Sequence, residues 1–207
     1  MIIAVDGPTA SGKGTISKAL AAHYRLPHLD TGLLYRAVGR QVAINGGDPD
    51  SPADARIACD FPADLLDDPA LRDEQVGSLA SRVSVHPEVR AALKQRQVDF
   101  AQQRGGALLD GRDIGTVIAP HADAKLFITA SPEVRAQRRC EEMRARGLGT
   151  DYQQILDDIR SRDERDRQRA DAPLKAADDA VLLDTSDLTI GAAVQAAIAA
   201  VEARLRK

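Results

Sequence analysis

The sequence predicts an α/β protein built on one parallel β-sheet flanked by helices. Four short apolar runs are spread along its 207 residues, at residues 2–5, 107–109, 125–129 and 181–183. Each run ends at an acidic or hydroxyl residue and leads into residues typical of a loop or a helix start. Strands that alternate with helices in this way form parallel sheets. The length and a hydrophobic fraction of 43% suit a single domain spanning residues 1–207.

The composition argues against several classes of partner. A net charge of −3 gives no bulk attraction to nucleic acid or to an anionic membrane, and an aromatic fraction of 3% argues against base-stacking surfaces. No apolar run approaches about 18 residues, and no basic leader with an apolar core is seen at the start. Cys59 and Cys140 have no metal-binding spacing. We therefore expect a cytoplasmic, reduced protein, acting as a monomer.

The first predicted strand leads into a glycine-rich loop with the sequence GPTASGKGT. Gly7, Gly12 and Lys13 match the phosphate-binding pattern GxxxxGK, and a helix is predicted at residues 16–23. In such a loop, successive backbone N–H groups point at phosphate oxygens, the helix N-terminus adds its positive dipole, and the lysine contacts the outer phosphates. We expect the whole loop to bind ATP, with Lys13 as a catalytic residue: Gly7, Pro8, Thr9, Ala10, Ser11, Gly12, Lys13, Gly14 and Thr15.

One position in this loop departs from the usual pattern. Gly14 stands where a Ser or Thr normally follows the lysine, and Thr15 comes one residue later. A direct hydroxyl ligand for Mg²⁺ is therefore missing at its usual place, and a GKGT ending resembles the nucleoside monophosphate kinases. The sequence predicts Mg²⁺ held largely through water molecules.

A second motif, LDTGLLYR at residues 29–36, crosses a predicted strand-to-helix turn. Asp30 or Thr31 could simply cap the helix, and Arg36 could be a surface charge. Together, the hydroxyl of Thr31 and the guanidinium of Arg36 would also suit an acceptor that carries a phosphate. The residues alone leave both interpretations open.

A third motif, DGRD at residues 110–113, follows the apolar run at 107–109. Ligands gather beyond the carboxyl ends of strands in an open parallel sheet, so Asp110 should lie near the metal and the phosphates, with contact to Mg²⁺ through water. Arg112 can neutralise phosphate charge, and Asp113 can accept hydrogen bonds from an amino group. The alternative is a structural ion pair between Arg112 and Asp113.

The middle and the end of the chain complete the expected architecture. Residues 46–69 are rich in Gly, Pro and Asp, which predicts loops and short helices, and helical periodicity returns at residues 74–103. We expect a mostly helical insertion at residues 46–104. Ser131 and Pro132 predict a helix start. In the last helix, spacings of three and four residues predict a stripe that packs in the core: Ile190, Val194, Ile198, Val201 and Leu205.

A dense charged run, RSRDERDRQR, covers residues 160–169. Such runs are usually solvated helix faces. Here Arg162, Asp166 and Arg169 fall on one face, with Arg165 beside them. Arginines crowded at one helix end repel one another unless an anion comes between them, and this favours a phosphate site. A lid with the arginine-rich helix is expected at about residues 145–170.

Taken jointly, these segments resemble the bacterial cytidylate kinases, nucleoside monophosphate kinases with a P-loop kinase fold. The resemblance runs from end to end, through GPTASGKGT, LDTGLLYR, SLASRVSVHPEVR, LLDGRDIGTVI and RSRDERDRQRADAPL. It implies transfer of the γ-phosphoryl group of ATP to CMP or dCMP, with Mg²⁺. Members of the family often carry a longer, partly β insertion between the LDTG helix and SLAS; here residues 46–73 are short and rich in Pro and Asp.

The resemblance also implies roles for single residues. Thr31 stands where the family has a serine that contacts the nucleotide. Ser81, Arg90 and Asp113 would contact the cytosine, Asp166 the ribose and Arg169 the base. The transferring phosphates would be held by Arg36, Arg112 and Arg162, of which Arg112 and Arg162 would be catalytic together with Lys13.

Two alternatives stay open at this point. Another P-loop small-molecule kinase, of the adenylate or shikimate type, would keep the loop and have a different acceptor pocket. A nucleotide-binding regulator would bind ATP without turnover. Because the acceptor of a nucleotide kinase is a phosphate oxygen that is already ionised at pH 7, none of the four histidines is needed as a general base.

Overall fold

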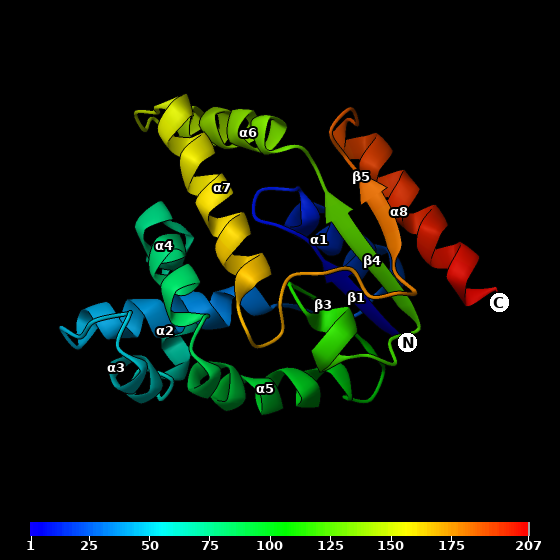
Figure 1. Ribbon diagram of the computed structural model, residues 1–207. Coiled ribbons are helices and arrows are strands. Elements are labelled where there is room, and N and C mark those ends of the chain that lie inside the picture. The colour runs from blue at the N-terminus through cyan, green and yellow to red at the C-terminus, as the bar shows by residue number, and fades with distance from the viewer. Residues whose placement is uncertain (207) are drawn as a thin grey trace.

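The computed structural model describes residues 1–206 and contains a five-stranded parallel sheet with helices on both faces (Figure 1). In sheet order the strands are β2 (His28–Asp30), β3 (Ala107–Gly111), β1 (Ile2–Asp6), β4 (Ala124–Thr129) and β5 (Val181–Asp184). All neighbouring strands pair in parallel. The predicted α/β class is confirmed. The carboxyl ends of the strands share one edge, where ligands bind in open sheets.

Alternate residues of the strands face two separate cores, as the two-residue period of a strand dictates. Ile3 and Val5 of β1 face one core, which two helices cover, whereas Ala4 faces the other, below α5 and a short π-type helix. Burial on both faces explains why the central strands are continuous apolar runs. The covering helices are α1 (Lys13–Tyr24) and α8 (Ile190–Leu205) on the first face, and α5 (Pro87–Ala101) and η3 (Ile114–Ile118) on the second.

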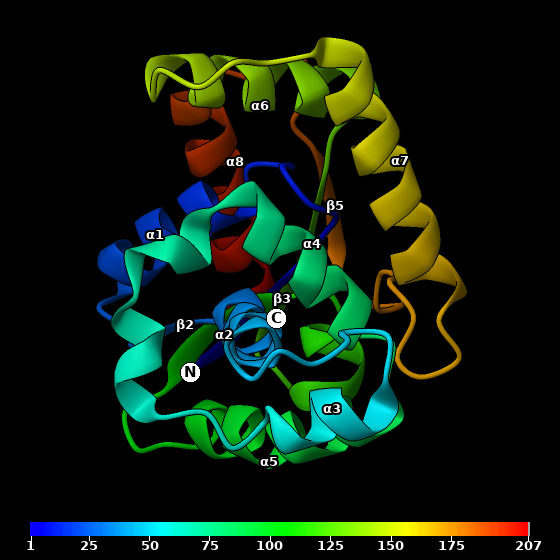
Figure 2. The ribbon, with the colours of Figure 1, turned by 90° about the vertical axis from the view of Figure 1, so that its left-hand side faces the viewer.

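The segment between β2 and β3 is helical (Figure 2), and its long and short helices share a third core, to which α5 contributes Val89 and Leu93. Its Pro, Ser and Asp residues begin these helices: Ser51 and Asp68 each accept a backbone hydrogen bond at a helix start. As expected, residues 46–73 hold loops and short helices, and this part of the described chain has no strand. The elements are α2 (Thr31–Ile44), α3 (Pro52–Ile57), η1 (Ala63–Asp67), η2 (Pro69–Arg72) and α4 (Glu74–Val83).

Two further helices, α6 (Pro132–Ala145) and α7 (Tyr152–Gln168), pack against each other beyond the carboxyl edge of the sheet (Figure 1). Ser131 caps α6 as expected, accepting from the Val134 N–H at 3.2 Å. The charged run at residues 160–169 is the second half of α7 and its end. The boundaries of the insertion and lid, 46–104 and about 145–170, stay predictions.

The C-terminal part differs from the central strands and from one expectation. The run at residues 181–183 forms the edge strand β5, and Leu182 is 66% exposed. Of the stripe expected in α8, Val201 is buried and Val194 and Ile198 pack against the core, whereas Ile190 is 71% exposed and Leu205 is also exposed. Ala193 and Ala197 are the other buried residues of this helix. Small side chains let α8 approach α1 and the sheet closely, and the large residues at its ends lie outside that contact. Within residues 1–206, no helix is both long and apolar enough to cross a bilayer.

Candidate active site

The glycine-rich loop is fixed in a conformation that only glycine allows at its first position. Gly7 has φ 154°, and a Cβ there would lie 2.0 Å from the Ile128 carbonyl oxygen. Gly12, in the left-handed region at φ 87°, immediately precedes α1. Within the described residues, the backbone N–H groups of residues 11–14 donate no hydrogen bond. Free N–H groups at a helix N-terminus are the donors that a phosphate chain requires.

Two side chains outside the loop fix its backbone by donating hydrogen bonds to its carbonyl groups. Arg135 donates to the Thr9 carbonyl at 3.1 Å, and the Thr185 hydroxyl donates to the Ser11 carbonyl at 3.1 Å. Arg135 is buried and also donates to both carboxylate oxygens of Asp163, at 3.0 and 2.5 Å. The loop is therefore connected to α6, to α7 and to the end of β5. Sequence analysis did not find these residues.

Lys13 extends from the loop to the carboxyl end of β3. Its Nζ lies 3.1 Å from Asp110 Oδ1, and His28 Nε2 lies 2.7 Å from Oδ2 of the same carboxylate. Burial favours the neutral form of Asp110, but Lys13 and His28 outweigh it and lower the pKa of Asp110 to about 2. The carboxylate is therefore ionised beside the loop.

The residues at this end of the sheet fit a Mg²⁺ ion that keeps most of its water. The Asp110 carboxylate is ionised and buried beside the loop, with Lys13 Nζ 3.1 Å from its Oδ1, whereas both oxygens of neighbouring Asp6 accept backbone N–H groups, of Ile114 and Gly115, at 2.8 Å. Burial raises the pKa of Asp6 to about 6, against these two hydrogen bonds. Residues 1–206 contain no cluster of three potential metal ligands. A single carboxylate with several waters is the coordination that Mg²⁺ commonly accepts.

A pocket opens between the sheet edge, α2, α4 and α7. All of the residues expected to contact the acceptor line it, although they come from segments far apart in the sequence. They are Thr31, Arg36, Ser81, Arg90, Arg112, Asp113, Arg162, Asp166 and Arg169. Their arrangement brings together four motifs that were analysed separately.

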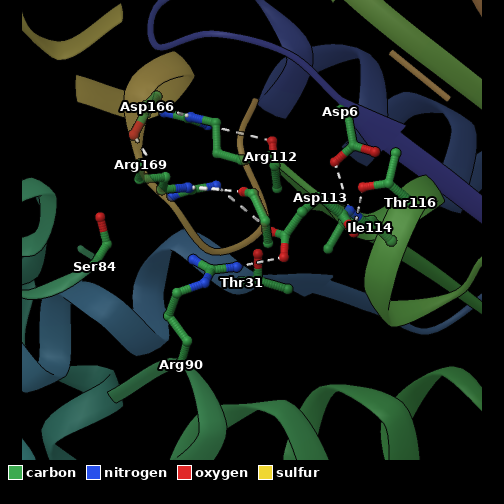
Figure 3. Close-up of polar contacts among 12 residues, drawn as sticks. Asp6, Thr31, Ser84, Arg90, Arg112, Asp113, Ile114, Thr116, Asp166 and Arg169 are labelled. Atoms are coloured by element: carbon green, nitrogen blue, oxygen red, sulfur yellow. Dashed lines mark hydrogen bonds and ion pairs between the residues drawn. The ribbon is translucent and has the colours of Figure 1, made fainter. Parts of the chain in front are cut away.

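Asp113 lies between two arginines at the inner part of this pocket (Figure 3). Arg90 donates to its carboxylate at 2.5 Å, and Arg169 lies 4.0 Å away. Burial raises the pKa of Asp113, although Arg90 and Arg169 oppose the rise. Arg112 pairs with Asp166 at 2.8 Å, so the structural ion pair considered between Arg112 and Asp113 is not formed. Arg169 Nη2 is buried without a hydrogen-bond partner in the described chain. The pocket thus presents a carboxylate and an unsatisfied guanidinium donor side by side.

The two interpretations of LDTGLLYR turn out to concern different residues. Asp30 caps α2 by accepting from the Gly32 N–H at 3.0 Å, which leaves Thr31 to face the pocket. The Thr31 hydroxyl donates to the Asp110 carbonyl at 2.8 Å, so its oxygen remains free as an acceptor. Arg36 is not a surface charge, because its side chain lines the pocket and donates to the Leu71 carbonyl at 2.7 Å.

The charged run of α7 divides by helix face. Arg162, Asp166 and Arg169 face the pocket as expected, and Arg165 donates to the Ser81 hydroxyl at 2.6 Å. Arg160 lies on the solvated side, where it pairs with Glu133. The run therefore combines a face that lines the pocket with a face exposed to solvent.

Sequence analysis missed Tyr35 and Ser84, which also line the pocket. The Arg90 guanidinium lies over the Tyr35 ring, 5.8 Å from its centroid. Burial raises the pKa of the Tyr35 hydroxyl. The spacing from Thr31 to Tyr35 is one helical turn, which places both on one face of α2 and could have identified Tyr35.

Comparison with known proteins agrees with this geometry. The family model for cytidylate kinase matches residues 3–54 and 62–203. A cytidylate kinase of Xanthobacter autotrophicus is 59% identical over 204 residues, which is 99% of this chain and 98% of that protein. A cytidylate kinase of Methylocella silvestris is 56% identical over 203 residues, 98% of this chain and 94% of that protein.

The chain belongs to the cytidylate kinase family. The two matched segments leave residues 55–61 between them, in the segment that links α2 to α4. A crystal structure of an uncharacterized protein from Eubacterium ventriosum shares the fold, with a TM-score of 0.58 at 15% identity and 98% coverage of both chains.

Proposed function

We propose that this cytidylate kinase family member transfers the γ-phosphoryl group of ATP to the phosphate of CMP or dCMP, giving CDP or dCDP and ADP. The observation that carries the proposal is the shared pocket beside a phosphate-binding loop. Residues from four distant motifs meet there, and their chemistry suits a nucleoside monophosphate. Two free cysteines suit a reduced cytoplasm.

ATP binds along the glycine-rich loop, with its phosphates on the free N–H groups and on Lys13. A cavity of about 690 Å³ next to the loop supplies room for the adenosine. Its lining includes Gly12, Thr15 and exposed Ile190, together with Arg138, which donates to the Thr185 hydroxyl at 3.1 Å. An apolar side chain and a guanidinium are suitable contacts for a purine ring.

The acceptor base is read by the inner part of the pocket. The exocyclic amino group of cytosine donates to Asp113, and its ring acceptors receive hydrogen bonds from Arg169 and Ser81. Arg90 fixes the Asp113 carboxylate, and Asp166 accepts from the ribose. The unpartnered Arg169 Nη2 supports this assignment, since a buried donor without an acceptor is unfavourable until a ligand supplies one.

The acceptor phosphate lies toward the loop, among Arg36, Arg112 and Arg162. Its attacking oxygen is ionised at neutral pH, so positioning and charge neutralisation supply the catalysis. Mg²⁺, when bound near Asp110 through water, neutralises charge on the phosphates of ATP. Lys13, Arg112 and Arg162 stabilise the negative charge of the transferring group.

A coupled assay of ADP release with CMP, dCMP, UMP and AMP tests the proposal. CMP and dCMP should support rapid turnover, with CDP or dCDP detected as product. Brisk phosphorylation of AMP without CDP formation would instead favour an adenylate-type kinase. ATP binding without turnover of any acceptor would favour a regulator.

A further inference from the structure

Glu74, at the start of α4, lies where the path of phosphoryl transfer should run. A cavity of about 410 Å³ extends from the glycine-rich loop, at Thr9, Ala10 and Gly14, to the arginines of the acceptor pocket. Arg36 and Arg162 line both this cavity and the acceptor pocket. A phosphate passing from ATP to its acceptor would cross this junction, and Glu74 is part of its wall.

The Glu74 carboxylate binds two arginines of this junction, one with each oxygen. Its Oε1 lies 2.6 Å from Arg162 Nη2, and its Oε2 pairs with Arg139 Nη2. Among the ion pairs of residues 1–206, Arg162 has no acidic partner except Glu74. The third arginine, Arg36, donates to the carbonyl groups of Leu71 and Asp73, just before Glu74.

The electrostatics of the junction match those of an occupied phosphate site. Burial favours the neutral form of Glu74, but Arg162 and Arg139 outweigh it, so the pKa of Glu74 is lowered. Burial and the charge of Arg162 lower the pKa of Arg36. A carboxylate presents two oxygens to guanidinium groups much as a phosphate does. Glu74 thus offsets the mutual repulsion of the arginines.

We propose that Glu74 is an internal counter-anion, which occupies the phosphate position in the ligand-free protein and gives it up when a phosphate chain binds. The inference rests on the proposed function, since it takes the junction to be a phosphate site. It also explains how α4, beside α7 in Figures 1 and 2, is held to α6 and α7 without substrate. Glu74 can leave because its side chain is 36% exposed.

The test compares two neutral variants in the full chain. Glu74→Gln keeps the shape of the side chain and removes its charge. Glu142→Gln makes the same change in the other acid that pairs with Arg139, at 2.7 Å, and among the described residues Glu142 forms no ion pair with Arg162. Binding of inorganic tripolyphosphate is measured by calorimetry at low salt without Mg²⁺. Glu74→Gln should bind about tenfold more tightly than wild type, because the anion no longer displaces a carboxylate, and Glu142→Gln should change less than threefold.

A second measurement needs no substitution. The Glu74 carboxyl is followed by NMR in the wild-type chain as the pH is varied, with and without tripolyphosphate. Its pKa should lie below the ordinary value when the site is free and rise when the anion is bound, because the arginines then neutralise the ligand. An unchanged Glu74 pKa, unchanged or weaker binding by Glu74→Gln, or an equal gain in both variants would overturn the proposal. CMP turnover by wild type is measured separately, so its absence would reject the proposed function and leave these results interpretable.

Discussion

The buried ion pair between Arg135 and Asp163 should be the polar contact on which both stability and loop geometry depend most. Arg135 belongs to α6 and Asp163 to α7, and their side chains are 2% and 5% exposed. Arg135 also donates to the carbonyl groups of Ala130, at 2.9 Å, and Thr9, at 3.1 Å. Its hydrogen bonds thus join α6 and α7 to the glycine-rich loop.

Asp163→Asn removes the negative charge and leaves the guanidinium buried. Removing one partner of a buried ion pair typically costs about 3–5 kcal/mol, and the remaining amide oxygen puts this change near the lower end, about 3 kcal/mol. In a domain of this size, that loss corresponds to a fall in Tm of roughly 6–12 °C. The free energy of unfolding is measured by urea denaturation, and KM for ATP is measured without urea, where the variant is folded.

A paired replacement separates stability from loop geometry. Arg135→Met with Asp163→Leu leaves no buried charge, so most of the lost stability should return. The Thr9 carbonyl stays without its donor, so KM for ATP should rise roughly tenfold, about 1.4 kcal/mol of binding. A loss below 1 kcal/mol in Asp163→Asn would contradict the stability argument. A paired variant with wild-type KM for ATP would contradict the role in the loop.

Three further predictions concern single residues. Lys13→Ala should remain folded and lose several orders of magnitude in kcat, roughly 3–5 kcal/mol of transition-state stabilisation, and near-normal kcat would reject the loop as the catalytic site. Asp113→Ala should reduce the ratio of kcat/KM for CMP to kcat/KM for UMP by the factor that corresponds to about 1–3 kcal/mol. Arg162→Ala should lower kcat/KM for CMP and for UMP alike and so leave their ratio unchanged. Equal changes of the ratio in the two variants would refute this division of roles. Asp6, whose pKa is raised from 3.8 to about 6, contributes stability that is full below pH 3.8 and is lost as the pH rises through 6. From pH 5 to 8 the unfolding free energy of wild type should therefore fall by roughly 1–1.5 kcal/mol relative to Asp6→Asn, and a constant difference would contradict that pKa.

The sequence predicted the sheet because strands and their order with helices depend on local patterns. Apolar runs with a polar residue at the end identify parallel strands, and the carboxyl ends of such strands bring Lys13, Asp110 and Asp113 to one edge. The structure supplies the register of β1 and β3, in which Asp110 pairs with Val5, next to the start of the loop. The expectation that the acceptor residues lie together came from the family resemblance, because the contact between α4 and α7 is tertiary and no local pattern predicts it.

The missed residues share a different property, since their partners lie far away in the chain. Arg135 looks like any charge in a helix rich in arginine, and only the contact with Asp163, 28 residues later, shows that it is buried. Glu74 is a second case, because its partner Arg162 also lies far away in the sequence. The predicted stripe of α8 failed only at its ends, Ile190 and Leu205, because periodicity does not show where the contact with α1 and the sheet begins and ends. Tyr35 could have been identified from its spacing of one helical turn from Thr31.

The degree of burial distinguishes two kinds of ion pair in this site. Arg135 and Asp163 are almost inaccessible, so a ligand cannot replace either partner, and the pair serves as permanent framework. Arg162 is 12% exposed and Glu74 36% exposed, at a cavity that opens toward the loop, so an anion of higher charge can take the place of the carboxylate. The two pairs therefore act on different arginines. The fixed pair orients Arg135, which holds the Thr9 carbonyl and so the glycine-rich loop in place before any phosphate arrives. The exchangeable pair, on the proposal above, keeps Arg162 neutralised when no phosphate is present, so α4 and α7 can approach each other without a buried, unpaired charge.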